Sequence, residues 1–187
     1  MPTVCVFCSS SERIDPGYVE LAGEVGAEIA RRGHRLVSGG GRVSMMGAVA
    51  RAARAGGAHT LGVIPQALMG REVADEDADE LVVTAGMRER KARMDDAADA
   101  FVVLPGGIGT LEELLEIWVA RSLGMHVKPI VICDPTSAFD HLHALLRHLT
   151  DAGFVGPEAS AELVWTSSAR EALDAVEAGL RSPTGRG

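Results

Sequence analysis

Residues 100–118 read AFVVLPGGIGTLEELLEIW, and this stretch decides the fold of the chain. Its first five residues are all apolar and predict a buried strand, and Pro105 ends the hydrogen-bonding ladder of that strand. Three glycines within 106–109 allow a sharp turn of the backbone, and helical periodicity is expected over 110–123. The stretch therefore predicts a strand, a glycine turn and a helix, which together form the repeating unit of an α/β protein.

The same unit recurs outward from this stretch in both directions. Strands are expected at residues 3–8, 34–38, 60–64, 81–84, 100–104, 129–133 and 162–166. Helices are expected at 16–32, from the glycines 39–41 to residue 55, and at 87–98, 110–123, 139–151 and 169–180. Continuous apolar strands alternating with helices are typical of a parallel sheet covered on both faces. We therefore expect an α/β fold with a doubly wound, Rossmann-like parallel β-sheet, as a single domain over residues 1–181 with a disordered tail at 182–187.

Composition narrows the classes of function. The 187 residues carry a formal net charge of −8 and few aromatic side chains, which argues against binding of nucleic acid but not of one small anion. No apolar run is long enough for a membrane span, and the N-terminal segment reads as a strand instead of a signal peptide. A cytoplasmic protein without a membrane segment is expected.

The three cysteines are Cys5, Cys8 and Cys133. Cys5 and Cys8 form a C-x-x-C pair, but residues three apart on a strand point to opposite faces, which does not suit a redox pair. A zinc site needs further ligands, and the six histidines form no ligand motif. We expect structural, reduced thiols and no metal.

The turn at 106–109 has the properties of an anion site. A helix N-terminus presents unpaired N–H groups and the positive end of the helix dipole. The glycines do not match the G-x-G-x-x-G of a dinucleotide site after a first strand, and no G-K-[ST] follows them. A dehydrogenase and a P-loop ATPase are therefore disfavoured.

Two interpretations of Glu113 remain open at this level. Thr110 to Glu113 fits the capping box T-x-x-E, in which the glutamate only satisfies an N–H group of the helix. Alternatively, Glu113 faces the glycine turn as a functional carboxylate, while Glu112 points elsewhere.

Two other segments follow strands and should lie at the same edge of the sheet. The glycines 39–41 either approach a ligand or only form a tight turn. In MRERKARM, residues 87–94, helical spacing places Arg90 on the same face as Met87 and Met94, with Lys91 beside Met87. An inward arginine either pairs with a core carboxylate or holds a phosphate.

The segments PGGIGTLEE, MRERKARM and GGGRVSMMGAVA together resemble the LONELY GUY family of cytokinin-activating phosphoribohydrolases. The resemblance extends from VFCSSS near the N-terminus to KPIVICDP and the helix beyond it. It implies hydrolysis of cytokinin riboside 5′-monophosphate to the free base and ribose 5-phosphate, commonly with AMP as a further substrate. It also implies a homodimer in which residues of the second subunit lie near the base, and no cofactor.

The resemblance assigns roles to particular residues. It implies that Glu113 is the catalytic acid and Arg90 its catalytic partner. The residues expected to bind substrate are Ser9, Gly40, Gly41, Glu72, Lys91, Gly106, Gly107, Gly109 and Thr110.

This chain departs from the family pattern at Arg88, at residues 42–46 and at Val119, all of which are expected to concern the base pocket. Two alternatives remain open: a non-catalytic carrier of a nucleotide or of molybdenum cofactor with the same fold, and a plain AMP nucleosidase. An older description of such sequences as lysine decarboxylases lacks support, because no pyridoxal phosphate lysine motif is recognisable.

Overall fold

A computed structural model describes residues 1–70 and 73–181. Glu72 and the tail at 182–187, which was predicted to be disordered, lie outside the described residues. One sheet contains seven parallel strands in the order β4-β3-β2-β1-β5-β6-β7. The strands are β1 (Thr3–Phe7), β2 (Arg35–Ser38), β3 (Thr60–Pro65), β4 (Glu80–Thr84), β5 (Ala100–Val103), β6 (Ile130–Cys133) and β7 (Leu163–Thr166).

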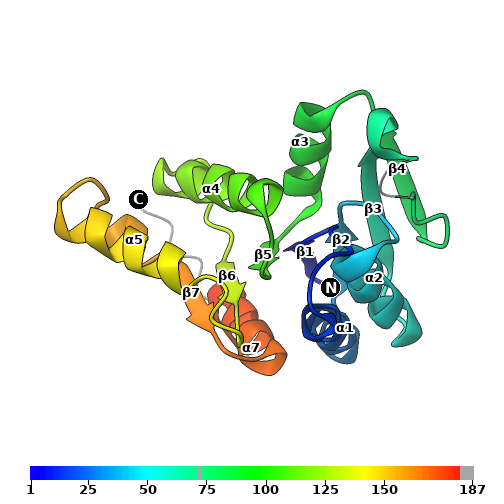
Figure 1. The fold of residues 1–187 in the computed structure, drawn as a ribbon, viewed down its shortest axis with the longest axis horizontal. Coiled ribbons are helices and arrows are strands. Elements are labelled where there is room, and N and C mark those ends of the chain that lie inside the picture. Colours follow the sequence, from blue (N-terminus) through cyan, green and yellow to red (C-terminus); the bar gives the residue numbers. More distant parts are fainter. Residues whose placement is uncertain (71–72, 182–187) are drawn as a thin grey trace.

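Helices cover both faces of the sheet (Figure 1). One face carries α1 (Pro16–Arg31), α2 (Ser44–Ala55) and α7 (Ala169–Arg181); the other carries α3 (Met87–Ala97), α4 (Ile108–Ser122) and α5 (Asp140–Asp151). The predicted doubly wound α/β architecture is confirmed. Two short elements were not expected, the 3-10 helix η1 (Gln66–Leu68) and α6 (Pro157–Ser160).

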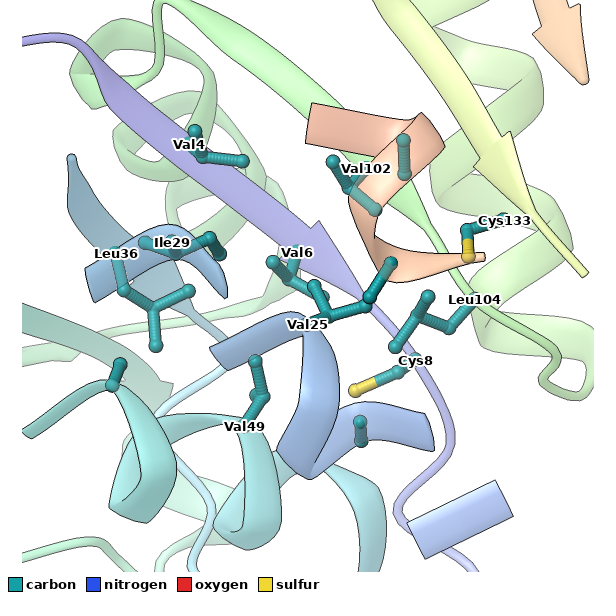
Figure 2. Packing of buried hydrophobic residues seen from close by; sticks show 14 of the residues in the cluster. Val4, Val6, Cys8, Val25, Ile29, Leu36, Val49, Val102, Leu104 and Cys133 are labelled. Atoms are coloured by element: carbon teal, nitrogen blue, oxygen red, sulfur yellow. The ribbon is translucent and has the colours of Figure 1, made fainter. Parts of the chain in front are cut away.

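Alternation along β1 divides the core into two layers. Val4 and Val6 pack with α1, α2 and α7, as Figure 2 shows for Val25 and Ile29 of α1. Phe7 points the other way, toward α3 and α4, and stacks on Phe101 of β5. Since both faces of the central strands are buried, these strands read as continuous apolar runs in the sequence.

The cysteines follow the same alternation. Cys8 belongs to the layer under α1, whereas Cys5 belongs to the layer under α3 and α4, so the pair does point to opposite faces. All three cysteines are buried. Burial raises the pKa of the Cys5 thiol well above its usual value and that of Cys133 to about 11, so both stay protonated near neutral pH.

The strand order reverses between β1 and β5. The chain moves outward from β1 through β2, β3 and β4, returns to β5, and then moves outward in the other direction. The loops after β1 and β5 therefore separate and leave a crevice at the carboxyl ends of the strands, where ligands bind in open α/β sheets. Among the described residues, no helix is long and apolar enough to cross a membrane.

Candidate active site

A cavity of about 880 Å³ lies at this reversal point. Its walls come from the end of β1 and the loop after it, the start of α2, α3, and the N-terminal turns of α4. The residues that line it are Val6, Phe7, Cys8, Ser9, Ser10, Ser11, Glu12, Arg13, Gly39, Val43, Met46, Leu68, Arg90, Met94, Gly107, Ile108, Gly109, Thr110 and Glu113.

The N-terminus of α4 opens into this cavity. The helix begins at Ile108, two residues earlier than expected, and its N-cap is Gly107 without a side-chain cap. The capping-box interpretation of Thr110 is therefore wrong, because Thr110 lies inside the first turn, buried against Gly106. A β-carbon on Gly106 would lie 2.1 Å from Oγ1 of Thr110, so only glycine fits there. The first amide with an intrahelical partner is that of Leu111, and the preceding amides can bind an anion.

The two neighbouring glutamates of α4 diverge. Glu113 lines the large cavity and also a second one of about 400 Å³ between α3 and α4. Oε1 of Glu112 instead accepts a hydrogen bond of 2.5 Å from Nζ of Lys91 on α3. Successive helical residues differ in direction by about 100°, so the cavity receives one carboxylate of the pair.

Arg90 reaches the large cavity from α3 with only 5% of its surface exposed. Its Nε donates to the carbonyl of Val63 at 3.1 Å, and its Nη2 donates to the carbonyl of Gly39 at 2.9 Å. Met94 is buried beside it, whereas Met87 is nearly half exposed, so the expected methionine face is only partly inward. These carbonyl bonds fix the plane of the guanidinium at the ends of β2 and β3.

Arg90 and Glu113 both affect the pKa of the buried Cys5 thiol. After burial itself, the Glu113 carboxylate raises the pKa of Cys5, and the Arg90 guanidinium lowers it. Both side chains also line the large cavity. The structure brings together the two residues that the resemblance paired.

Lys91 bridges the two helices that bear these charges. Its Nζ binds Glu112 and, at 2.8 Å, Oε2 of Glu116, and these hydrogen bonds raise the pKa of the lysine. Lys91 lines the smaller cavity and is not among the residues that line the larger one. Its visible role is to hold α3 against α4.

The remaining residues predicted to bind substrate are distributed as follows. Ser9, Gly107, Gly109 and Thr110 line the large cavity, whereas Gly106 packs behind Thr110. Gly40 and Gly41 do not line it: Gly40 accepts a hydrogen bond of 2.9 Å from the amide of Asp75, and Gly41 forms a β-bridge with Ala74. Gly40 has a φ of +73°, a conformation that favours glycine.

The departures from the family pattern also reach the cavities. Val43 and Met46 line the larger cavity, while Arg88 and Val119 line the smaller one. Sequence reasoning did not identify Glu12, Arg13 or Leu68 as cavity residues. Only the serine-rich loop after the first strand could have pointed to Arg13, since loops at that edge of the sheet carry ligands.

The connection between β3 and β4, which supplies Leu68, is anchored by a buried ion pair. Nη1 of Arg54 lies 2.8 Å from Oδ2 of Asp75, Nη2 lies 3.1 Å from Oδ1, and the Asp75 side chain is 5% exposed. We expect Asp75→Asn to lower the free energy of unfolding by about 3 kcal/mol, because it leaves the Arg54 charge unpaired. Urea denaturation measures this loss, with the exposed Asp77→Asn as the matched control. Equal stability of the two variants would contradict the anchoring role.

The described residues contain no group of three or more His, Cys, Asp or Glu side chains that could hold a metal ion.

Comparison with known proteins identifies the family of this chain. Residues 46–176 match a family model described as "Possible lysine decarboxylase". Two similar curated proteins are cytokinin riboside 5′-monophosphate phosphoribohydrolases of Mycobacterium marinum, 53% identical over 95% of this chain and 94% of that protein, and of Mycobacterium tuberculosis, 55% identical over 92% of each. An Arabidopsis thaliana protein of the same name is 42% identical over 93% of this chain and 80% of its own length.

Solved structures share the fold. A molybdenum cofactor binding protein from Rippkaea orientalis has a TM-score of 0.72 and 21% identity, over 95% of this chain and 96% of that one. The molybdenum cofactor carrier protein of Chlamydomonas reinhardtii has a TM-score of 0.71 and 23% identity, over 96% and 98% of the two chains. At these identities the likeness concerns the fold alone.

The lysines do not fit a pyridoxal phosphate decarboxylase. The chain has two, Lys91 and Lys128. Lys91 is held by two glutamates, and Nζ of Lys128 is 2.7 Å from a carboxylate oxygen of Asp95. A lysine that forms a Schiff base needs a lowered pKa, whereas ion pairing raises that of Lys91. With full-length relatives at up to 55% identity, the chain belongs to the family of cytokinin riboside 5′-monophosphate phosphoribohydrolases.

Proposed function

We propose that this protein hydrolyses the N-glycosidic bond of a cytokinin riboside 5′-monophosphate, releasing the free base and ribose 5-phosphate. The observation that carries the proposal is that Glu113, Arg90 and the N-terminus of α4 share one cavity at the strand-order reversal. The names of the curated relatives support the substrate class.

The phosphate is expected to bind at the start of α4. The residues just ahead of Leu111 line the cavity, and the helix dipole favours an anion there. Binding at this end holds the ribose near the second turn of the helix, in which Glu113 lies. The glycine turn therefore supplies orientation to the reaction.

Glu113 is proposed to act on the ribose. As the bond between C1′ and the base nitrogen breaks, the base keeps the electron pair and takes up a proton, and positive charge develops on the ribose. A nearby carboxylate stabilises that charge and accepts a proton from the water whose oxygen bonds to C1′. Arg90, held by two carbonyls, keeps a positive charge beside the carboxylate and the sugar.

The base is proposed to lie toward the smaller cavity. That cavity shares Phe7 and Glu113 with the larger one and is lined by apolar side chains of α4 such as Ile117 and Val119. An N6-substituent would meet Arg88 and Val119 there, two positions at which the chain departs from its family.

One assay tests the activity against its alternatives. Purified protein is incubated with AMP and with isopentenyladenosine 5′-monophosphate, and the released bases are separated by chromatography. Release of isopentenyladenine is expected, with AMP as a further substrate. Cleavage of AMP alone would identify a plain AMP nucleosidase, and tight binding without release of either base would identify a carrier.

A homodimer in the cytoplasm completes the proposal. Leu123 and Met125, at the end of α4, are 67% and 74% exposed and lie at the rim of the smaller cavity. A second copy covering these side chains would remove apolar surface from water and add residues near the base. The three buried, reduced thiols suit the reducing cytoplasm.

Leu123→Asp is expected to convert the dimer to a monomer, because a carboxylate would be buried at the centre of the contact. Size-exclusion chromatography with light scattering measures the mass. Val83→Asp, at a half-exposed valine on β4, is the control and should stay dimeric. A wild-type protein that runs as a monomer would refute the homodimer.

A further inference from the structure

The loop between β1 and α1 is held rigidly over the large cavity. The hydroxyl of Ser9 accepts a hydrogen bond of 3.0 Å from the amide of Ser11. The hydroxyl of Ser11 accepts one of 3.3 Å from the amide of Arg13. The hydroxyl of Ser44, at the start of α2, donates to the carbonyl of Ser11 at 2.6 Å. These bonds fix the backbone at Arg13 while its side chain stays exposed.

The charges in the cavity wall are balanced before any substrate enters. Among the described residues, two carboxylates line the cavity, Glu12 and Glu113, together with two cations, Arg13 and Arg90. A nucleotide 5′-phosphate adds close to two further negative charges. Binding it in this acidic protein therefore calls for a cation that can reach it.

Of these two arginines, Arg13 has the N–H donors that are available to bind a phosphate. Arg90 already gives Nε and Nη2 to the carbonyls of Val63 and Gly39. The Arg13 guanidinium, by contrast, makes no hydrogen bond or ion pair with the residues that the structure describes. A guanidinium presents a planar fork of donors that binds two phosphate oxygens at once.

We propose that Arg13, which lines the same cavity as the N-terminus of α4, binds the 5′-phosphate of the substrate and makes the site selective for phosphorylated nucleosides. The inference rests on the proposed function, since it assigns the phosphate to that cavity. The α4 amides and Arg13 would then bind the phosphate together, with Glu12 beside the arginine limiting the site to one phosphate group by repulsion.

The test compares Arg13→Ala and Arg13→Lys with Arg147→Ala, which removes an exposed arginine of α5 far from the cavity. Steady-state kinetics on the nucleotide should show KM raised at least about 10-fold in Arg13→Ala with little change in kcat, the loss of one charge-assisted contact. Arg13→Lys should recover part of the loss, and Arg147→Ala should match the wild type. A kcat loss at unchanged KM, or equal KM values for the two alanine variants, would overturn the inference.

Calorimetry with ribose 5-phosphate and with ribose separates this inference from the activity. Wild-type protein should bind ribose 5-phosphate, and Arg13→Ala should bind it at least about 10-fold more weakly. That result without any base release from nucleotides would refute the proposed function while supporting the role of Arg13. Base release by the wild type with unchanged ribose 5-phosphate affinity in Arg13→Ala would support the proposed function and refute the role of Arg13.

Discussion

Glu113→Gln is expected to lower kcat for nucleotide hydrolysis by about 1,000-fold, within the range for loss of a general acid–base group. The amide has nearly the same shape but can neither offset positive charge on the ribose nor accept a proton from water. Substrate affinity should change little, because the phosphate is bound by the α4 amides and Arg13. Single-turnover release of the base, together with nucleotide binding by calorimetry, measures both quantities.

Glu112→Gln is the matched control for this substitution. It alters the same functional group one residue earlier on the same helix, but its carboxylate binds Lys91, which Glu116 still holds. Its activity should stay near that of the wild type. Turnover by Glu113→Gln at the wild-type rate would remove Glu113 from the mechanism and leave the carrier as the better explanation of the cavity.

Gly39→Ala is expected to lower kcat/KM by about 100-fold, the effect of displacing a catalytic group by roughly 1 Å. A β-carbon at this position would lie 2.0 Å from Nη2 of Arg90 and 2.9 Å from the sulfur of Met46. The guanidinium must move, and it then loses its bond to the carbonyl of Gly39. Kinetics on purified, folded variant measures the loss.

A double-mutant cycle keeps this prediction falsifiable if Gly39→Ala also perturbs folding. In an Arg90→Ala background, Gly39→Ala should cost little further activity, because the group that it displaces is absent. Gly23→Ala is the control glycine substitution: it lies in α1 with no atom near its added carbon and should be neutral or stabilising. Independent, additive losses from Gly39→Ala and Arg90→Ala would show that Gly39 acts by another route.

The sequence anticipated the sheet because its central strands are buried on both faces. The apolar runs around Val4 and Val102 could be recognised without any knowledge of their neighbours, and the glycines at 106, 107 and 109 marked the turn into α4. The strand order, with β1 beside β5, came only with the structure, since parallel pairing joins segments far apart along the chain.

Local patterns were misleading where a long-range contact decided the outcome. Thr110 had the spacing of a capping box, but the helix starts earlier because Gly106 lets Thr110 pack directly on it. Gly40 and Gly41 had the composition of a ligand loop, yet they hold Ala74 and Asp75 of the next connection. Lys91 was expected to bind substrate, and the structure places its ammonium group between two glutamates of α4.

The α/β class could be predicted from the sequence alone, as could a site at the carboxyl ends of the strands, and the family resemblance suggested that Glu113 acts with Arg90. Periodicity and glycine placement are local properties of the chain, so they can be recognised without tertiary information. Two arrangements became visible only in the tertiary structure: the carbonyls of Gly39 and Val63 hold Arg90, and Arg13 lines the same cavity from the loop after β1. Those arrangements depend on three separate strand ends meeting at one edge, which no spacing along the chain records.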